Sequence, residues 1–137
     1  MNLLKPIVLF FFILLSCEKS DNFPEKNINI SVPITMPMYN NVYNTTWGYD
    51  YIDGGVGGII IVRAINNEFI AYDQACTNEA SSECAVIGET INDPILNCSC
   101  CTSKFIIIDG SVTEGPANQA LKKYNTYFDG VMLYVTN

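Results

Sequence analysis

Cys98-Ser99-Cys100-Cys101-Thr102-Ser103-Lys104-Phe105 is the stretch of this 137-residue chain that decides its fold. Cys76 and Cys84 precede it, so five of the six cysteines lie between positions 76 and 101, and the chain contains no histidine. Clustered cysteines build iron–sulfur clusters, structural zinc sites and disulfides. Chemistry that depends on an imidazole is excluded by composition. The candidate sites are therefore thiol sites.

The N-terminus has the pattern of a bacterial lipoprotein signal. Lys5 gives a positive start, and the apolar run of residues 7–15 is too short to span a bilayer as a helix. Leu14-Leu15-Ser16-Cys17 then resembles the lipobox, where bacterial lipoproteins are cleaved and acylated on the cysteine. An ordinary signal peptide followed by an incidental cysteine is the alternative. We expect residues 1–16 to be removed and Cys17 to carry lipid.

Such a lipoprotein would lie in the bacterial cell envelope, on a membrane and facing the periplasm or the exterior. The full chain has a net charge of −7, and removal of residues 1–16 takes away Lys5 alone, which leaves −8. A chain this acidic is repelled by phosphate backbones and by anionic lipid head groups. We therefore expect no nucleic-acid partner, and we expect the membrane to be reached through the acyl chain on Cys17.

The rest of the chain predicts one all-β domain. Residues 17–26 are polar and charged, as in a linker. Residues 27–32 alternate apolar and polar with period two, which predicts a half-buried strand, and Pro33 confines that strand to an edge or a bend. Residues 37–53, rich in Tyr and Asn, predict loops with one short strand. The domain is expected to cover residues 27–137.

Further strands are indicated by short β-rich runs that flank turns. These runs are residues 59–62 and 69–72 around Asn66-Asn67, residues 84–87 and 94–97, residues 105–108 before Asp109-Gly110, and residues 131–135 after Asp129-Gly130. The glycine-rich residues 54–58 lack the lysine of a phosphate loop and indicate a flexible turn before a strand. No segment has a sustained helical period.

At its cysteines the chain resembles the Rieske iron–sulfur domain. The two loops of that family read C-x-H-x-x-C and C-x-C-H-x-S-x-F, and here the first begins at Cys76 and the second is residues 98–105. The resemblance continues through Asp109-Gly110, Gly115-Pro116-Ala117, Leu121 and Tyr124, and covers roughly residues 57–135. It implies a Rieske-like antiparallel β-sandwich of short strands with two cysteine-bearing loops.

The resemblance also implies roles for individual residues. Rieske domains hold a [2Fe-2S] cluster with two cysteines and two histidines. Cys76 and Cys98 stand at the positions of the ligand cysteines, whereas Asn78 and Cys101 stand where the histidines are expected. Cys84 and Cys100 fall near the pair that forms a disulfide between the loops in many respiratory members, although Cys84 lies three residues later than usual. An ordinary Rieske centre cannot form without the two histidines.

Three uses of these thiols remain open. The favoured one is disulfide stapling with the cluster lost and no cofactor, because exported thiols usually pair, with one cysteine left over. The first alternative is an electron-transfer protein with an all-Cys [2Fe-2S] cluster, which uses Cys76, Cys98 and Cys101 with Cys84 or Cys100 and needs a redox partner. The second is structural zinc on the same set, although Cys76 and Cys84 are spaced widely for it.

A catalytic site is not indicated. No serine has a histidine base, and no pair of carboxylates is marked out by its spacing as an acid and base. We therefore expect a binding or structural module rather than an enzyme.

Overall fold

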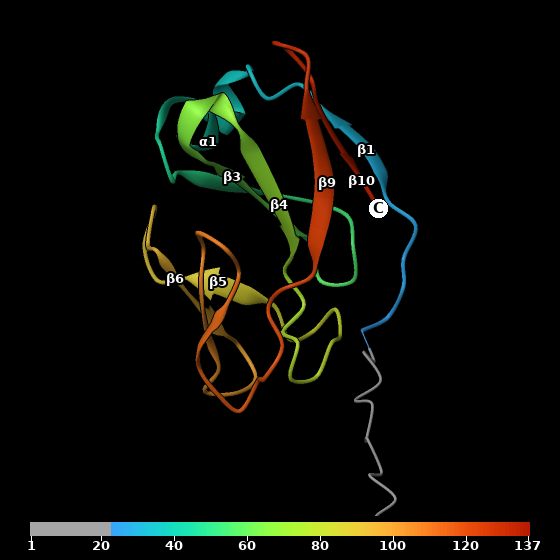
Figure 1. Cartoon of the computed structure of the whole chain (residues 1–137), viewed down its shortest axis with the longest axis vertical. Helices are drawn as coiled ribbons and strands as arrows, with labels where there is room; N and C mark the ends of the chain where they lie inside the picture. The colour runs from blue at the N-terminus through green and yellow to red at the C-terminus, as the bar shows by residue number, and fades with distance from the viewer. Residues whose placement is uncertain (1–22) are drawn as a thin grey trace, which may run out of the picture.

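The computed structural model describes residues 23–137 (Figure 1). The predicted signal peptide, the lipidation site Cys17 and most of the linker lie outside the described residues. The elements are β1 (Asn29–Val32), η1 (Pro37–Tyr39), α1 (Asn40–Asn44), β2 (Tyr49–Ile52), β3 (Ile59–Arg63), η2 (Ile65–Asn67), β4 (Phe69–Asp73), β5 (Val86–Gly88), β6 (Ile95–Cys98), β7 (Lys104–Ile106), β8 (Val112–Glu114), β9 (Lys123–Phe128) and β10 (Leu133–Thr136). This composition confirms the all-β prediction.

The strands form two antiparallel sheets. The larger has six strands in the order β1-β10-β9-β4-β3-β2, and the smaller has four in the order β5-β6-β7-β8. β1 pairs with β10 alone and lies at an edge, as Pro33 predicts. The predicted hairpins around residues 66–67 and between residues 84 and 97 are β3 with β4 and β5 with β6. The cysteine loops belong to the smaller sheet and its connection to β4.

β3 is buried on both faces, which explains its unbroken apolar run. Ile59, Ile60, Ile61 and Val62 are all fully buried, and their side chains alternate between two cores. Ile60 and Val62 belong to the core that holds the cysteines, together with Val86, Leu96 and Phe105 of the smaller sheet. Ile59 and Ile61 belong to the second core, which the larger sheet builds with the segments around β1 and α1. The cysteine loops therefore rest on a core between the sheets.

Residues 37–53 differ from the prediction of loops with one short strand. The strand is present as β2, but η1 and the five-residue helix α1 precede it. α1 is held by tertiary contacts: Val42 is fully buried, and its N–H donates to Asp50 Oδ2 at 2.9 Å. A helix this short carries no periodic pattern, so its sequence gives no sign of it.

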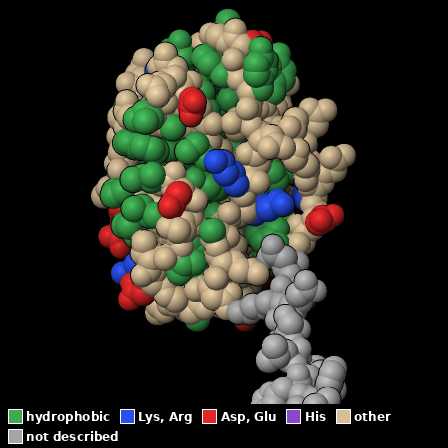
Figure 2. All heavy atoms as spheres, viewed as in Figure 1, with side chains coloured by type: hydrophobic (Ala, Val, Ile, Leu, Met, Phe, Trp, Pro, Cys, Tyr) green, Lys and Arg blue, Asp and Glu red, His purple; other side chains and the backbone are tan. Residues whose placement is uncertain are grey.

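The surface fits the acidic composition. The face drawn in Figure 2 carries Asp and Glu side chains and a few Lys and Arg side chains among apolar and neutral ones. Within residues 23–137, the structure contains no helix with the length and apolar character needed to cross a membrane.

Candidate metal centre

Two loops and the end of the strand beside them carry the five cysteines of the domain: Cys98 ends β6, and the other four lie in the loops. The first loop is residues 74–85, between β4 and β5, and the second is residues 99–103, between β6 and β7. The N–H of Cys76 donates to the carbonyl of Cys84 at 2.8 Å, which closes the first loop on itself. The N–H of Ser99 donates to the carbonyl of Ala85 at 3.0 Å and ties the second loop to the first. Backbone hydrogen bonds therefore hold the two loops side by side.

A disulfide joins Cys84 to Cys100, with their Cα atoms 5.3 Å apart. This is the pairing that the Rieske resemblance implies, so that expectation is confirmed. The bond also removes Cys84 from the proposed ligand set, in which it was the fourth thiolate. A sulfur bound in a disulfide offers no thiolate, and the four-cysteine set would exist only after reduction of this bond.

Three thiols remain free, and they converge. Cys76 and Cys98 are buried, and Cys101 is partly exposed. Their sulfur atoms all lie within 4.8 Å of one another, and those of Cys76 and Cys101 are 3.8 Å apart. Disulfide sulfurs lie about 2.05 Å apart, so these three residues are unbonded thiols. The second disulfide that stapling allows, from Cys76 to Cys98 or Cys101, is not formed.

Each free sulfur has a hydrogen-bond donor beside it. The N–H of Cys100 donates to Cys98 Sγ at 3.4 Å, and the backbone N–H of Asn78 interacts with the sulfur of Cys76. The Cys101 thiol donates to Ser103 Oγ at 3.1 Å, and a thiolate at Cys101 would accept the serine proton instead. Donors placed in this way stabilise sulfur in its anionic form.

The buried Ser103 is the most specific of these neighbours. Its Oγ accepts the N–H of Ala117 at 2.8 Å, so its own proton is free for donation to a thiolate at Cys101. This contact explains why the serine of the second loop and the Gly115-Pro116-Ala117 segment occur together in the resemblance. Burial raises the pKa of Cys101, but the hydrogen bonds from the side chain and backbone of Ser103 outweigh it and the net pKa is lowered.

The pKa of Cys76 is shifted in the opposite direction from that of Cys101. Burial raises the pKa of its thiol to about 12, and the hydrogen bond with the Cys98 thiol adds to the rise, while the backbone of Asn78 acts against it. With no metal bound, Cys76 is therefore protonated at neutral pH. The site therefore combines one thiol with a lowered pKa and one with a raised pKa.

The residues present do not fit the cluster of the Rieske family. That cluster needs two thiolates on one iron and two imidazoles on the other. Asn78 and Cys101 occupy the histidine positions, and the side chain of Asn78 is exposed. Among the described residues, the group of converging metal-ligand side chains holds three thiols and neither carboxylate nor imidazole. The chain therefore provides a three-sulfur donor set of a different kind.

A buried carboxylate that sequence reasoning missed fixes the first loop. Asp73 ends β4 and accepts hydrogen bonds from the N–H groups of Val56 at 2.6 Å, Gly57 at 3.0 Å and Ala75 at 2.8 Å. The glycine-rich turn packs against it: a Cβ on Gly57 would lie 2.7 Å from the backbone nitrogen of Ala75. The turn before β3 therefore positions the residue that precedes Cys76.

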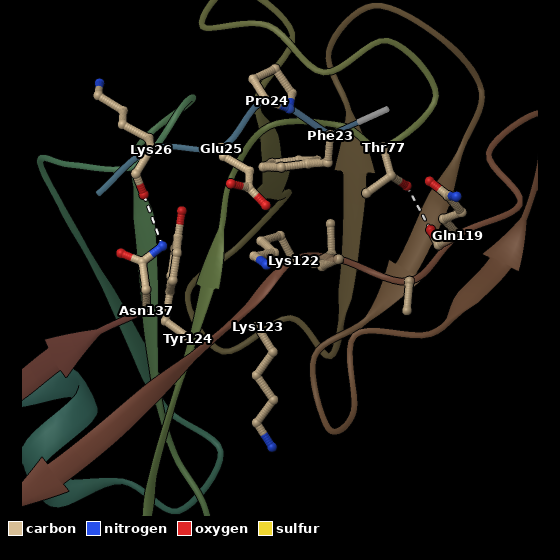
Figure 3. Close-up of a pocket in the computed structure, with 12 residues that line it drawn as sticks. Phe23, Pro24, Glu25, Lys26, Thr77, Gln119, Lys122, Lys123, Tyr124 and Asn137 are labelled. Atoms are coloured by element: carbon tan, nitrogen blue, oxygen red, sulfur yellow. Dashed lines mark hydrogen bonds between the residues drawn. The ribbon is translucent and has the colours of Figure 1, made fainter. Parts of the chain in front are cut away.

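A surface groove of about 790 Å³ lies beside the first loop (Figure 3). One wall is the N-terminal segment from Phe23 to Lys26, and the carbonyl of Lys26 accepts a hydrogen bond from the side chain of Asn137 at 3.0 Å. Thr77, next to Cys76, also lines the groove and donates to the carbonyl of Gln119 at 2.6 Å. The described chain therefore begins beside the first loop.

The sequence matches no protein-family model and no curated protein. Among solved structures, the chain is similar to a chain of the complex of reduced oxygenase and oxidized ferredoxin in carbazole 1,9a-dioxygenase. The TM-score is 0.51 at 14% identity, over 81% of this chain and 94% of that one. It is also similar to the plasma membrane Rieske protein PetC3 from Synechocystis PCC 6803. Here the TM-score is 0.54 at 23% identity, over 66% of this chain and 87% of that one. At these identities the two similarities show a shared fold alone.

Proposed function

We propose that this chain, whose fold is Rieske-like, is a lipid-anchored domain of the bacterial cell envelope that has lost the His-ligated cluster of its fold. In its place, two loops stapled by the Cys84–Cys100 disulfide present a site of three thiols. The disulfide has a structural role, and the domain works as a binding module rather than as an enzyme.

The observation that carries this proposal is the division of the five cysteines. Cys84 and Cys100 are paired, whereas Cys76, Cys98 and Cys101 converge as free thiols. These three residues stand at positions where the Rieske resemblance expects cluster ligands. A domain that needed only a disulfide between its loops has no use for three unpaired thiols that converge. A domain that carried the usual cluster would need two imidazoles. Neither description accounts for the site.

The proposal of a lipid anchor on Cys17 rests on the sequence. The fold indicates how far the thiol site would lie from that anchor. Five residues lie between Cys17 and Phe23, and the six residue steps from one to the other span at most about 22 Å. Phe23 lines the groove that Thr77 of the first loop also lines. Acylation of Cys17 would therefore hold the thiol site within a few nanometres of the bilayer, where a membrane-bound partner would find it.

Anchoring is tested with the full chain expressed in a bacterial host supplied with an alkyne-tagged fatty acid. We expect the chain to take up the label and to sediment with membranes. Cys17→Ser should lose the label and appear in the soluble fraction. Equal membrane association of the two forms would overturn the lipoprotein proposal.

The state of the cysteines is tested on the same Cys17→Ser chain, purified without reductant and then denatured in iodoacetamide. We expect Cys76, Cys98 and Cys101 to be alkylated and one disulfide to remain. Metal analysis should find no pair of irons per chain. Two irons with visible charge-transfer absorption would instead support the electron carrier with an all-Cys cluster.

A further inference from the structure

We propose that Cys76, Cys98 and Cys101 form a binding site for a single thiophilic metal ion, and that the site prefers Cu(I) over Zn²⁺. The inference rests on the proposed function, since it assigns the ligand of the site that replaces the His-ligated cluster. The inference goes beyond the proposed function because a domain that has lost its cluster need not bind any metal.

The spacing of the sulfurs fits one ion. Metal–thiolate bonds of about 2.3 Å place two sulfurs about 3.8 Å apart around a tetrahedral ion and about 4.0 Å apart around a trigonal one. The sulfurs of Cys76 and Cys101 are 3.8 Å apart, and no pair within the set exceeds 4.8 Å. Ligands of two different irons lie on opposite sides of a cluster and must be farther apart. One ion can reach all three sulfurs with little movement of the loops.

The number of ligands distinguishes between metals. A structural zinc site is almost always tetrahedral with four protein ligands. Here the fourth thiolate is missing because Cys84 is bonded to Cys100, and the converging group contains neither carboxylate nor imidazole. Soft thiolates bind both Cu(I) and zinc, so the number of ligands decides between them. Cu(I) is satisfied by three thiolates in a plane. The donor set is complete for Cu(I) and incomplete for Zn²⁺.

The surroundings supply the support that thiolate ligands require. The N–H of Asn78 lies beside the sulfur of Cys76, and the N–H of Cys100 donates to that of Cys98. The Cys101 thiol donates to Ser103 Oγ, and a metal-bound thiolate at Cys101 would accept the serine proton instead. Such outer contacts orient the ligands and tune their affinity for the metal. All three donors come from the two loops, so the disulfide that holds the loops together also preserves the site.

The site is apolar on its inner side. Cys76 and Cys98 belong to the core between the sheets, with Leu96, Phe105 and Leu121. Cys101 is the partly exposed member and provides the way in from solvent. The core side therefore offers a bound ion no polar group besides the thiols.

The test is an anaerobic titration of the purified Cys17→Ser chain with Cu(I), buffered by a competing chelator, and in parallel with Zn²⁺. We expect one Cu(I) per chain, and X-ray absorption at the copper edge should find three sulfur neighbours and neither nitrogen nor oxygen. Zn²⁺ should compete only weakly. Zn²⁺ bound in preference to Cu(I), or copper bound through nitrogen or oxygen, would overturn the assignment.

Variants locate the site. Cys76→Ser, Cys98→Ser and Cys101→Ser should each lower Cu(I) affinity by at least about 100-fold, and Ser103→Ala by about 10- to 100-fold. Ser99→Ala changes an exposed residue of the same loop and should bind as the parent does. Retention of affinity in Cys98→Ser would exclude the three-sulfur site.

A cysteine variant could lose Cu(I) binding because it fails to fold. Protection of the thiols in the parent chain therefore provides a test that needs no variant. One equivalent of Cu(I) should protect all three thiols from iodoacetamide together, and a chain whose thiols stay equally reactive would contradict the proposal. The same experiments distinguish failure of the Cu(I) site from failure of the proposed function. Three free thiols, one disulfide and no copper would leave the proposed function intact and remove only this inference.

Discussion

The hydroxyl of Tyr124 donates a hydrogen bond of 2.7 Å to Oδ2 of Asp73, a residue 51 positions earlier in the chain. Both residues are buried, and the same carboxylate also binds the N–H of Ala75, directly before Cys76. Burial, and next the hydrogen bond to Asp73, raise the pKa of Tyr124 above its usual range. This pair connects β9 to the start of the first loop.

Removal of the Tyr124 hydroxyl should destabilise the domain. Tyr124→Phe leaves the charged Asp73 with one donor fewer in a buried place, and we expect a loss of about 1.5–3 kcal/mol in the free energy of unfolding. Urea denaturation at neutral pH measures it. Tyr127→Phe, at an exposed position on the same strand, is the matched control and should be neutral. Equal stability of the two variants would show that the hydrogen bond contributes nothing.

Tyr72→Phe should act in the opposite direction. Tyr72 is fully buried, and its hydroxyl has no hydrogen-bond partner among the described residues. Burial, and next the charge of Asp109, raise its pKa to about 12. Because an unpaired buried hydroxyl is unfavourable, its removal should stabilise the domain by about 1 kcal/mol. A destabilised Phe variant in the same urea assay would mean that the hydroxyl has a bound partner.

The free thiols should differ in reactivity. Cys101 is partly exposed with a lowered pKa, whereas Cys76 is buried with a pKa of about 12. Since the thiolate is the nucleophile, brief treatment of the native, metal-free protein with iodoacetamide near neutral pH should label Cys101 first and Cys76 last. Peptide mass spectrometry gives the order. Ser103→Ala should slow the labelling of Cys101, and earlier labelling of Cys76 would contradict the assigned environments.

Stability should fall in alkaline solution. The Cys76 thiol ionises at about 12 in the folded protein and near its ordinary value of 9.0 when unfolded. Between these values the folded state binds more protons than the unfolded one, so the free energy of unfolding decreases as pH rises. Urea midpoints measured from neutral pH upward should decline above pH 9.0, and Cys76→Ala should decline less steeply. Parallel curves would show that another group dominates.

Loss of the Cys84–Cys100 disulfide should destabilise the domain by about 3 kcal/mol, the value expected for a loop of this length. The double variant Cys84→Ser/Cys100→Ser should match the reduced parent in urea denaturation, and reductant should not change it further. A large additional effect of reductant on the double variant would indicate a second disulfide among the remaining cysteines.

Local parts of this fold could be predicted from the sequence. Turns flanked by β-rich runs identify the hairpins β3–β4 and β5–β6, and Pro33 places β1 at an edge. The Rieske resemblance adds the Cys84–Cys100 pairing and the convergence of the two loops. These features depend on short stretches of sequence or on a known pattern.

The remaining features depend on distant contacts. The position of β10 between β1 and β9 follows from pairings that no local pattern encodes. Asp73 is a single carboxylate at the end of a strand, and its role appears only when the glycine turn, Ala75 and Tyr124 meet around it. One clue was present: an ionisable residue that ends an apolar strand just before a cysteine loop needs several donors to be buried.

The two cores of this domain are separate, and that separation sets how the protein can open. The core of the larger sheet contains neither a cysteine nor a residue of β5–β8. The smaller sheet has only short strands, so we expect it to open and close as one cooperative unit while the larger sheet remains folded. Hydrogen exchange would then be faster in β5–β8 than in β4 and β9. Ligand exchange at the thiols would follow that partial opening and would not require the domain to unfold.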